Sequence, residues 1–361
     1  EVEIGFVFGA AFSAEKAMEA IETLSKSEDI DNAISISDKR WEKLCSTLAV
    51  ATVDKSFNAL VNTWLPYELA ASFIRKEKGM HCLNPVHAAD MLKYALPLCG
   101  AEPAIVKNAI LDFAGRITTR GFYCPETDSI AAVPPEKLLW LTYVTANYIS
   151  ETGCMDILNE SVTSFDNTTI MTIREHCDRA IGVCLNDANS SVDHDFLELV
   201  LKQWSLVTGK DISPTKIANE KSGDRKEYAE ERNLPRKVSY LQSLSPILQS
   251  NAFTEYLKGT VDSFAGEVSS LYALYSAAVN EILGLTPVCD GLVLNPNLPK
   301  SWPECEIVRI YRKDTYRISI TRSTEPLKNS PSIIVDGEPL LGNTLPFFND
   351  GKEHKIDVSV C

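Results

Sequence analysis

The chain has 361 residues, of which 45% are hydrophobic and 23% charged, the proportions of an ordinary folded protein rather than a disordered one. Its formal net charge of −14 disfavours nucleic acid and anionic membranes as partners and leaves neutral ligands such as sugars open. Apolar runs all stop short of the roughly 18 residues that a membrane helix needs. We therefore expect no membrane segment, and a chain long enough for one large and one small domain.

The start of the chain and its cysteines indicate a cytoplasmic protein. The opening run Glu1-Val2-Glu3-Ile4-Gly5-Phe6 has no Met and no basic residue of the kind that begins a signal peptide. We interpret residues 1–10 as a remnant strand or linker. The ten cysteines include no Cys-x-x-Cys pair, and a chain of this length does not need disulfide bonds. Reduced thiols are therefore expected, without a metal site.

Residues 11–285 are predicted to form a helical body. The run Leu138-Leu139-Trp140-Leu141 and the three residues after it are apolar on almost every side of a helix, which predicts a deeply buried helix. A second pattern repeats at helical spacing and stops at Gly284, a residue typical of helix ends. Its apolar positions are Val268, Leu271, Tyr272, Tyr275, Val279 and Ile282.

After Gly284 the hydrophobic period changes from helical to alternating. Residues 307–312 and 316–320 alternate on either side of Lys313-Asp314, which predicts a β-hairpin with its turn at those two residues. The strand pattern at 333–335 is followed by Asp336-Gly337, a strong turn signal. We therefore predict a small antiparallel β-module over residues 286–361.

Several blocks of this sequence resemble glycoside hydrolase family 94, which includes cellobiose and chitobiose phosphorylases and their relatives in cyclic glucan synthesis. The C-terminal cluster is the strongest, and further matches keep the order of the family. The blocks are Phe8-Gly9-Ala10, Leu138-Leu139-Trp140-Leu141, Thr152-Gly153, Glu175-His176-Cys177, Gly284-Leu285, the run from Asp290 to Pro299, Trp302, Val335-Asp336-Gly337 and the run from Asp350 to His354.

The resemblance implies a mainly α fold, a partial (α/α)6 barrel followed by the small antiparallel β-module. It also implies a lineage that cleaves β-glucosides with inorganic phosphate and inverts the anomeric centre. Such chemistry needs a carboxylic acid that protonates the leaving oxygen and donors that hold the phosphate. The expected partners are an oligosaccharide or β-glucan and, in an active enzyme, inorganic phosphate. The resemblance implies no cofactor.

The catalytic acid of the family lies in a Gly-Asp-Trp-Asn-Asp-Gly stretch that this chain lacks. The corresponding region runs Leu185-Asn186-Asp187-Ala188-Asn189 and continues to Asp195. Asp187, Asp193 and Asp195 are the remaining candidates for a substitute acid. Acids at the start of a helix are also favoured by the helix dipole alone, so this cluster has an ordinary structural explanation.

The binding residues implied by the resemblance are also incomplete. A Phe-Arg-Asp sugar-binding motif corresponds to Ala88-Ala89-Asp90, so the acid is retained and the guanidinium is not. Trp64 and Glu68, the latter in place of a family Gln, are the best remaining sugar-binding pair. A phosphate-holding Thr-Gly-Ser turn corresponds to Val268-Ser269-Ser270, which leaves Ser269 and Ser270 as weak phosphate ligands.

These losses affect one functional unit, so we expect a degenerate relative that retains glycan binding or a structural role, a pseudoenzyme. One alternative is an active phosphorylase or hydrolase with a rebuilt active site. Another is a fragment of a larger glycosyltransferase or phosphorylase. A homodimer is a further option. Loss of the general acid alone lowers a rate by about 10²–10⁴, and loss of the phosphate site lowers it further.

Overall fold

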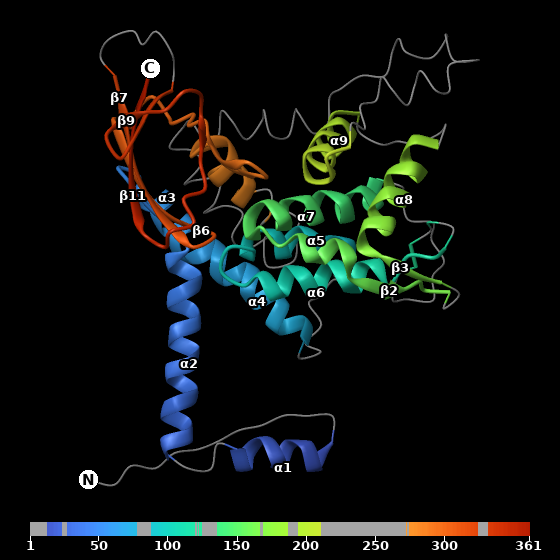
Figure 1. Ribbon diagram of the computed structural model, residues 1–361. Helices are drawn as coiled ribbons and strands as arrows, with labels where there is room; N and C mark the ends of the chain where they lie inside the picture. Colours follow the sequence, from blue (N-terminus) through green and yellow to red (C-terminus); the bar gives the residue numbers. More distant parts are fainter. Residues whose placement is uncertain are drawn as a thin grey trace, which may run out of the picture.

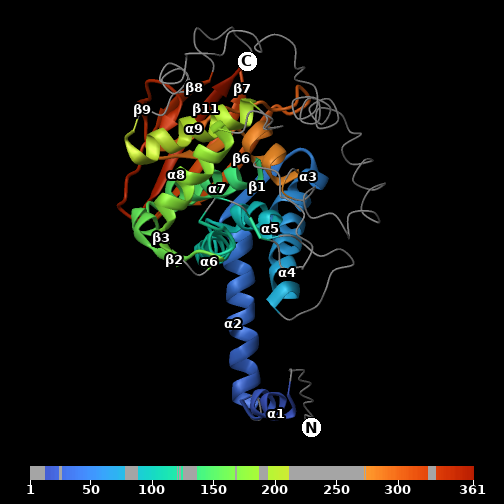
Figure 2. The same cartoon turned by 90° about the vertical axis from the view of Figure 1, so that its right-hand side faces the viewer.

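The structure is a computed structural model in which a curved sheet and a group of packed helices lie side by side (Figure 1). Two perpendicular views show a long helix, α2, that projects away from both (Figures 1 and 2). The predicted segment 1–10 lies outside the described residues and stays a prediction. The structure describes residues 13–23, 27–77, 88–119, 121, 123–124, 136–166, 169–186, 194–210, 272, 274–323 and 331–361.

The helical part is organised around α7, which contacts α5, α6, α8 and α9. The predicted burial of this helix is confirmed, because Leu138, Leu139, Leu141 and Val144 are all at most 3% exposed.

The described helices are α1 (Ala14–Thr23), α2 (Ser27–Ser46), α3 (Lys55–Ala59), the π-helix η1 (Leu60–Trp64), α4 (Leu65–Glu77), α5 (Ala88–Ala95), η2 (Leu96–Leu98), α6 (Pro103–Ala114), α7 (Glu136–Thr152), η3 (Met155–Asn159), α8 (Ile173–Asn186), α9 (His194–Thr208) and the π-helix η4 (Ala277–Ile282).

The largest sheet has six strands in the order β1-β6-β7-β11-β8-β9. Its members are β1 (Leu48–Thr52), β6 (Glu304–Tyr311), β7 (Asp314–Arg322), β11 (Glu353–Val360), β8 (Ser332–Val335) and β9 (Glu338–Pro339). All neighbours are antiparallel except β7 and β11, which run parallel. The described residues also form two small sheets, β10 (Thr344–Leu345) with β5 (Gly291–Leu294) and β4 (Leu285–Val288), and β2 (Ser161–Thr163) with β3 (Ile170–Thr172).

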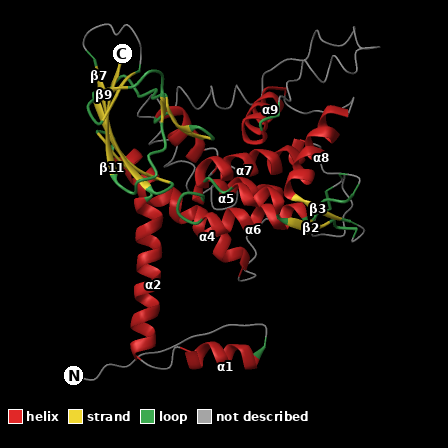
Figure 3. Cartoon of the chain, viewed as in Figure 1, coloured by secondary structure: helices red, strands yellow, loops and turns green. Residues whose placement is uncertain are grey.

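The prediction of a mainly α chain with a partial (α/α)6 barrel is wrong, because the fold is a mixture of α and β structure (Figure 3). The segment predicted to be helical contains the strands β1, β2 and β3, and β1 is a member of the large sheet. Its partner β6 begins at Glu304, and local periodicity cannot show a pairing so distant in sequence. The predicted hairpin of β6 and β7 is confirmed, with its turn at Arg312-Lys313, one residue earlier than expected.

The outer edge of β1 is covered by two side-chain amides. Asn62 donates to the Val50 carbonyl at 2.9 Å and accepts from the Val50 N–H at 2.8 Å. Asn58 makes the same pair of bonds with Thr52, both at 3.0 Å. Four helical residues rise about 6 Å, close to the advance of about 7 Å over two strand residues, so both amides reach alternate strand positions. The exposed edge of the sheet is therefore satisfied without another strand.

Gly284 ends η4 as the sequence predicts. Its φ of +72° lies in the left-handed region, and a Cβ at this position would come within 2.1 Å of the Asn295 carbonyl group. The Asn295 N–H donates to the Gly284 carbonyl at 2.8 Å. A side chain is therefore excluded both by backbone conformation and by space.

Strand β6 and its turn bind the C-terminal end of α7. The Tyr311 hydroxyl donates to the Ser150 carbonyl at 2.8 Å, and the Arg312 guanidinium donates to the same oxygen at 3.0 Å. Arg309 donates to Glu151 in an ion pair whose side chains are 8% and 6% exposed. A cation at the C-terminal end of a helix also interacts favourably with the helix dipole. These contacts join the six-stranded sheet to the helical part.

Replacement of Asn62 by Ala should lower the free energy of unfolding by about 1–3 kcal/mol, because the Val50 N–H and carbonyl lose their partner. The measurement is urea unfolding of the full chain followed by circular dichroism. Asn108, exposed on α6, provides the matched control, and Asn108→Ala should stay within about 0.5 kcal/mol of the parent. Equal stabilities of the two variants would contradict the role of Asn62 at the strand edge.

Glu151→Leu should destabilise the chain by about 3–5 kcal/mol, because it leaves the buried Arg309 cation without a counter-ion. The double variant Glu151→Leu with Arg309→Met removes both charges and should recover much of this loss. Denaturant unfolding of both single variants and the double variant gives the coupling energy between the two positions. Additive effects of the two substitutions would show that the pair does not act as a unit.

Candidate functional site

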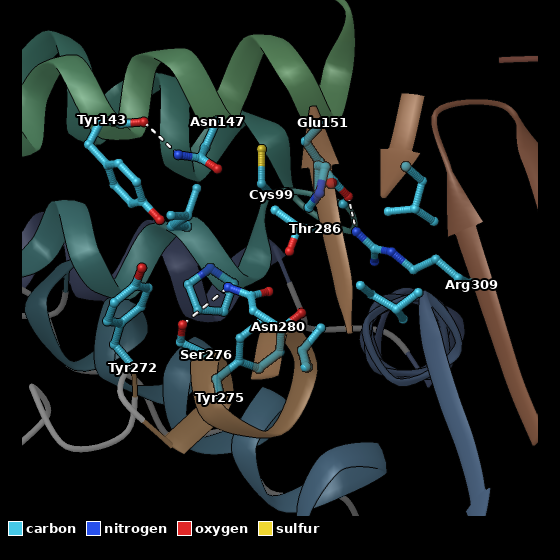
Figure 4. A pocket seen from close by; sticks show the side chains of 17 residues that line it. Cys99, Tyr143, Asn147, Glu151, Tyr272, Tyr275, Ser276, Asn280, Thr286 and Arg309 are labelled. Carbon is cyan, nitrogen blue, oxygen red and sulfur yellow. Dashed lines mark hydrogen bonds and ion pairs between the residues drawn. The ribbon is translucent and has the colours of Figure 1, made fainter. Parts of the chain in front are cut away.

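A cavity of about 70 Å³ with a mixed polar and apolar lining lies where α7, η4, β4 and β6 meet (Figure 4). One water molecule needs roughly 10–15 Å³ by this measure, so the cavity has room for several. Its lining combines aromatic, amide and hydroxyl groups with one ion pair. The lining residues are Leu96, Pro97, Cys99, Gly100, Tyr143, Asn147, Glu151, Tyr272, Tyr275, Ser276, Val279, Asn280, Leu285, Thr286, Pro287, Leu292 and Arg309.

One wall of the cavity is a polar stripe on α7. Tyr143, Asn147 and Glu151 follow one another at intervals of four residues, which places them on one face of the helix. Other faces of α7 pack against the neighbouring helices. Asn147 is fixed by its amide, which donates to the Tyr143 carbonyl at 2.8 Å and to Gln203 at 3.1 Å.

The facing wall repeats the same interval. Tyr272, Ser276 and Asn280 are also four residues apart, and Asn280 donates to the Ser276 hydroxyl at 3.1 Å. Residues 274–276 are helical and continue into the π-helix η4 at Ala277. A π-helix is a local form often found at functional sites. In Figure 4 the hydroxyl groups of Tyr143 and Tyr272 point toward one another across the cavity.

The electrostatic balance of the cavity is set by the ion pair of Arg309 and Glu151. Burial by itself would lower the pKa of Arg309, but the Glu151 carboxylate outweighs it and the pKa is raised. Among the described residues that line the cavity, Arg309 is the one cation and Glu151 the one anion. The two charges compensate each other, so the lining is neutral overall.

The neutral groups of the lining keep their protons. Burial raises the pKa of Tyr143, Tyr272 and Tyr275, so all three carry hydroxyl hydrogens at neutral pH. Burial, together with the nearby Glu151, also raises the pKa of Cys99, which holds it as a thiol. The cavity therefore offers hydroxyl and amide donors and acceptors, the groups that pair with alcohols and water.

The predicted sugar-binding pair Trp64 and Glu68 lies elsewhere. Trp64 ends η1 and Glu68 lies in the first turn of α4, so they are one helical turn apart and both half-buried. Neither lines the described cavity. Trp64 packs against the hydrophobic core. Their role in sugar binding stays a prediction.

The other predicted site residues are not described at side-chain level. Asp187, Asp193, Ser269 and Ser270 lie outside the described residues. Asp90 and Asp195 belong to α5 and α9, but only their backbone is described. Within the described part of the chain, no cluster of His, Cys, Asp and Glu has a geometry that could hold a metal ion.

The sequence analysis does not predict this cavity, because the apolar run over 138–144 and the stripe that includes Tyr272 and Tyr275 indicate core positions. A signal is present on α7, where Tyr143, Asn147 and Glu151 put hydroxyl, amide and carboxyl groups on one helix face at intervals of four residues. Ser276 and Asn280 continue the same interval from Tyr272. None of the helices in the described ranges has both the length and the apolar character needed to cross a membrane.

No family model matches the chain, but curated proteins resemble parts of it. Solabiose phosphorylase of Paenibacillus borealis is 29% identical over 115 residues, which is 30% of this chain and 15% of that protein. The cyclic β-(1,2)-glucan synthase NdvB of Rhizobium meliloti is 26% identical over 168 residues, 45% of this chain and 6% of that protein. N,N'-diacetylchitobiose phosphorylase of Vibrio proteolyticus is 35% identical over 72 residues, 20% of this chain and 9% of that protein.

Among solved structures, a family GH92 α-mannosidase from Bacteroides thetaiotaomicron matches 76% of this chain and 34% of its own, at 11% identity and a TM-score of 0.27. A likeness this low carries no argument. The sequence relatives are the informative ones, although the matched regions span at most 15% of their length. They confirm the resemblance read from the motifs: this chain is related to the glycoside phosphorylases and cyclic glucan synthases of glycoside hydrolase family 94.

Proposed function

We propose that the chain is a phosphorylase-related domain that binds a neutral oligosaccharide or β-glucan and does not phosphorolyse it. The observation that carries the proposal is the compensated ion pair of Arg309 and Glu151 in an otherwise neutral polar cavity. Sugar sites combine aromatic surfaces with a few well-placed hydrogen-bonding groups. Tyr143, Tyr272 and Asn280 supply both kinds of group.

Phosphate binding has little support in this cavity. A phosphate dianion is held by cations and N–H donors that are free to face it. The Arg309 guanidinium already donates to Glu151, and the pair brings no net positive charge. The family relation therefore supports sugar recognition better than it supports recognition of the second substrate, inorganic phosphate.

The same pair also weighs against acid catalysis by Glu151. A general acid must present an O–H to the leaving oxygen of the substrate. Glu151 instead serves as the acceptor of the buried Arg309 guanidinium. The loss of the family's acid motif points the same way, and among the described residues that line the cavity Glu151 is the one carboxyl group.

A second candidate is favoured by the lengths of the relatives. The chain matches at most 15% of any of the relatives described above, so the domain could act as one part of a larger glycosyltransferase or phosphorylase. An active centre rebuilt on Asp187, Asp193 or Asp195 is the remaining alternative. A cytoplasmic location stays a prediction. The homodimer stays a prediction.

The absence of phosphorolysis is directly measurable. The purified chain, incubated with inorganic phosphate and cellobiose, laminaribiose, sophorose or N,N'-diacetylchitobiose, should release no sugar 1-phosphate above background. A chitobiose phosphorylase assayed in parallel shows that the conditions support the reaction. Sustained formation of sugar 1-phosphate at several turnovers per second would overturn the pseudoenzyme proposal and favour a rebuilt active site.

Sugar binding in the cavity is tested by Asn280→Leu, which removes hydrogen-bonding groups and keeps the side-chain volume. Affinity for cello- or laminari-oligosaccharides, measured by calorimetry or ligand-observed NMR, should fall about tenfold, which corresponds to roughly 1.4 kcal/mol. Glu281→Gln, exposed on the same π-helix, is the control and should bind as the parent does. Oligosaccharide binding that is unchanged in Asn280→Leu would exclude the cavity as the site.

A further inference from the structure

His354 lies in a cluster of side chains where two turns of the large sheet meet. It is the second residue of β11 and only 7% exposed. Its ring stacks on Phe348, with 3.5 Å between ring centroids and 14° between planes. Such a stack fixes the ring plane, so both ring nitrogens have defined directions.

Each ring nitrogen of His354 faces a carboxylate. Nδ1 lies 2.7 Å from Oδ2 of Asp336, and Nε2 lies 3.2 Å from Oδ1 of Asp350. Asp336 belongs to the Asp-Gly turn between β8 and β9, whereas Asp350 belongs to the turn that precedes β11. The imidazole is therefore the side chain that bridges these two turns.

The protonation state of the ring decides whether both contacts can exist. A neutral imidazole has one N–H, so one of its nitrogens would direct a lone pair at a carboxylate oxygen. Only the imidazolium donates to both carboxylates. The geometry therefore favours the ring that carries a proton on each nitrogen.

The two turns also have backbone conformations that need support. Asp336 and Asn349 have φ values of +49° and +55°, in the left-handed region that disfavours ordinary residues. The Asp336 carboxylate accepts from the Lys355 N–H at 2.8 Å, and Asp350 accepts from the Lys352 N–H at 2.9 Å. The two carboxylates thus connect the imidazolium to the backbone at the start of β11.

We propose that His354 is a proton-operated clamp: as the imidazolium it ties the β8–β9 turn to the turn before β11, and on deprotonation it releases one of them. The turn before β11 is preceded by Phe347, and the Arg312 guanidinium stacks on the Phe347 ring with its central carbon 3.5 Å from the ring centroid. Arg312 in turn binds the end of α7. The clamp therefore acts next to the junction of the sheet with the helices.

The charged groups around His354 come from three elements. Besides Asp336 and Asp350, Lys352 approaches the Asp350 carboxylate at 3.4 Å. From β7, Asp314 accepts from the backbone N–H groups of residues 349, 350 and 351 at 2.7–3.1 Å, so this turn keeps that anchor when His354 is neutral. Tyr316, also on β7, has its ring centroid 6.4 Å from that of His354.

The direction of the pH effect follows from these neighbours. Burial by itself would lower the pKa of His354, but the bonds to Asp336 and Asp350 outweigh it and raise the pKa above the ordinary 6.5. A raised pKa in the folded state stabilises the fold below 6.5, and this contribution is lost as the pH rises through the higher value. The pKa of Asp336 is lowered chiefly by His354, so its contribution is lost instead in acid, below about 3.8.

The experiment is an NMR titration of the imidazole signals in the full chain, with His354 assigned by the signal that His354→Gln lacks. We expect His354 to titrate above 6.5, and to titrate at lower pH in Asp336→Asn and in Asp350→Asn. Titration of His354 at or below 6.5 in the parent would overturn the proposal. The two Asn variants retain the imidazole, so they keep the test valid even where His354→Gln folds poorly.

Thermal unfolding gives an independent readout. The melting temperature of the parent should exceed that of His354→Gln by more at about pH 5.5 than at about pH 8.5, on either side of the His range. His194→Gln, at an exposed position on α9, is the matched control and should show no such difference. A deficit in His354→Gln that is equal at both pH values would mean that the ring only packs and does not act through its proton.

Discussion

Strand β6 meets the C-terminal end of α7 through a buried ion pair and two hydrogen bonds to one carbonyl, and the rest of the molecule is arranged around this meeting point. Arg309 binds Glu151, while Tyr311 and Arg312 share the Ser150 oxygen. Strand β6 lies between β1 and β7 in the sheet, and α7 lies among four other helices. A contact between these two elements therefore fixes how the sheet and the helices sit against each other.

A charged junction has a consequence for packing. The Arg309 and Glu151 side chains are removed from water, so they need each other and further polar neighbours to remain stable. The pair lines the same cavity as the polar side chains of α7 and of the segment from Tyr272 to Asn280. The contact that joins the sheet to the helices is therefore also part of the wall of the candidate sugar site.

Side chains also replace the backbone partners that the sheet lacks. Asn58 and Asn62 pair with β1 as a neighbouring strand would, and Asp314 accepts three consecutive N–H groups in the turn before β11. His354 adds a proton-dependent bridge to the same region. In each case a buried or edge polar group is satisfied locally, which lets short strands and tight turns persist at the margin of the sheet.

Local sequence patterns predict the buried helix at 138–144, the end of η4 at Gly284 and the hairpin of β6 and β7. These features depend on periodicity and on glycine, which act between near neighbours in the chain, whereas the relation to family 94 follows from the order of motifs along it. The folded chain adds that Leu48–Thr52 is a strand of the large sheet, that β7 and β11 run parallel, and that Glu151 faces Arg309. Each of these depends on two segments far apart in sequence, and the free energy of such a pairing becomes available only when the chain has brought both partners together.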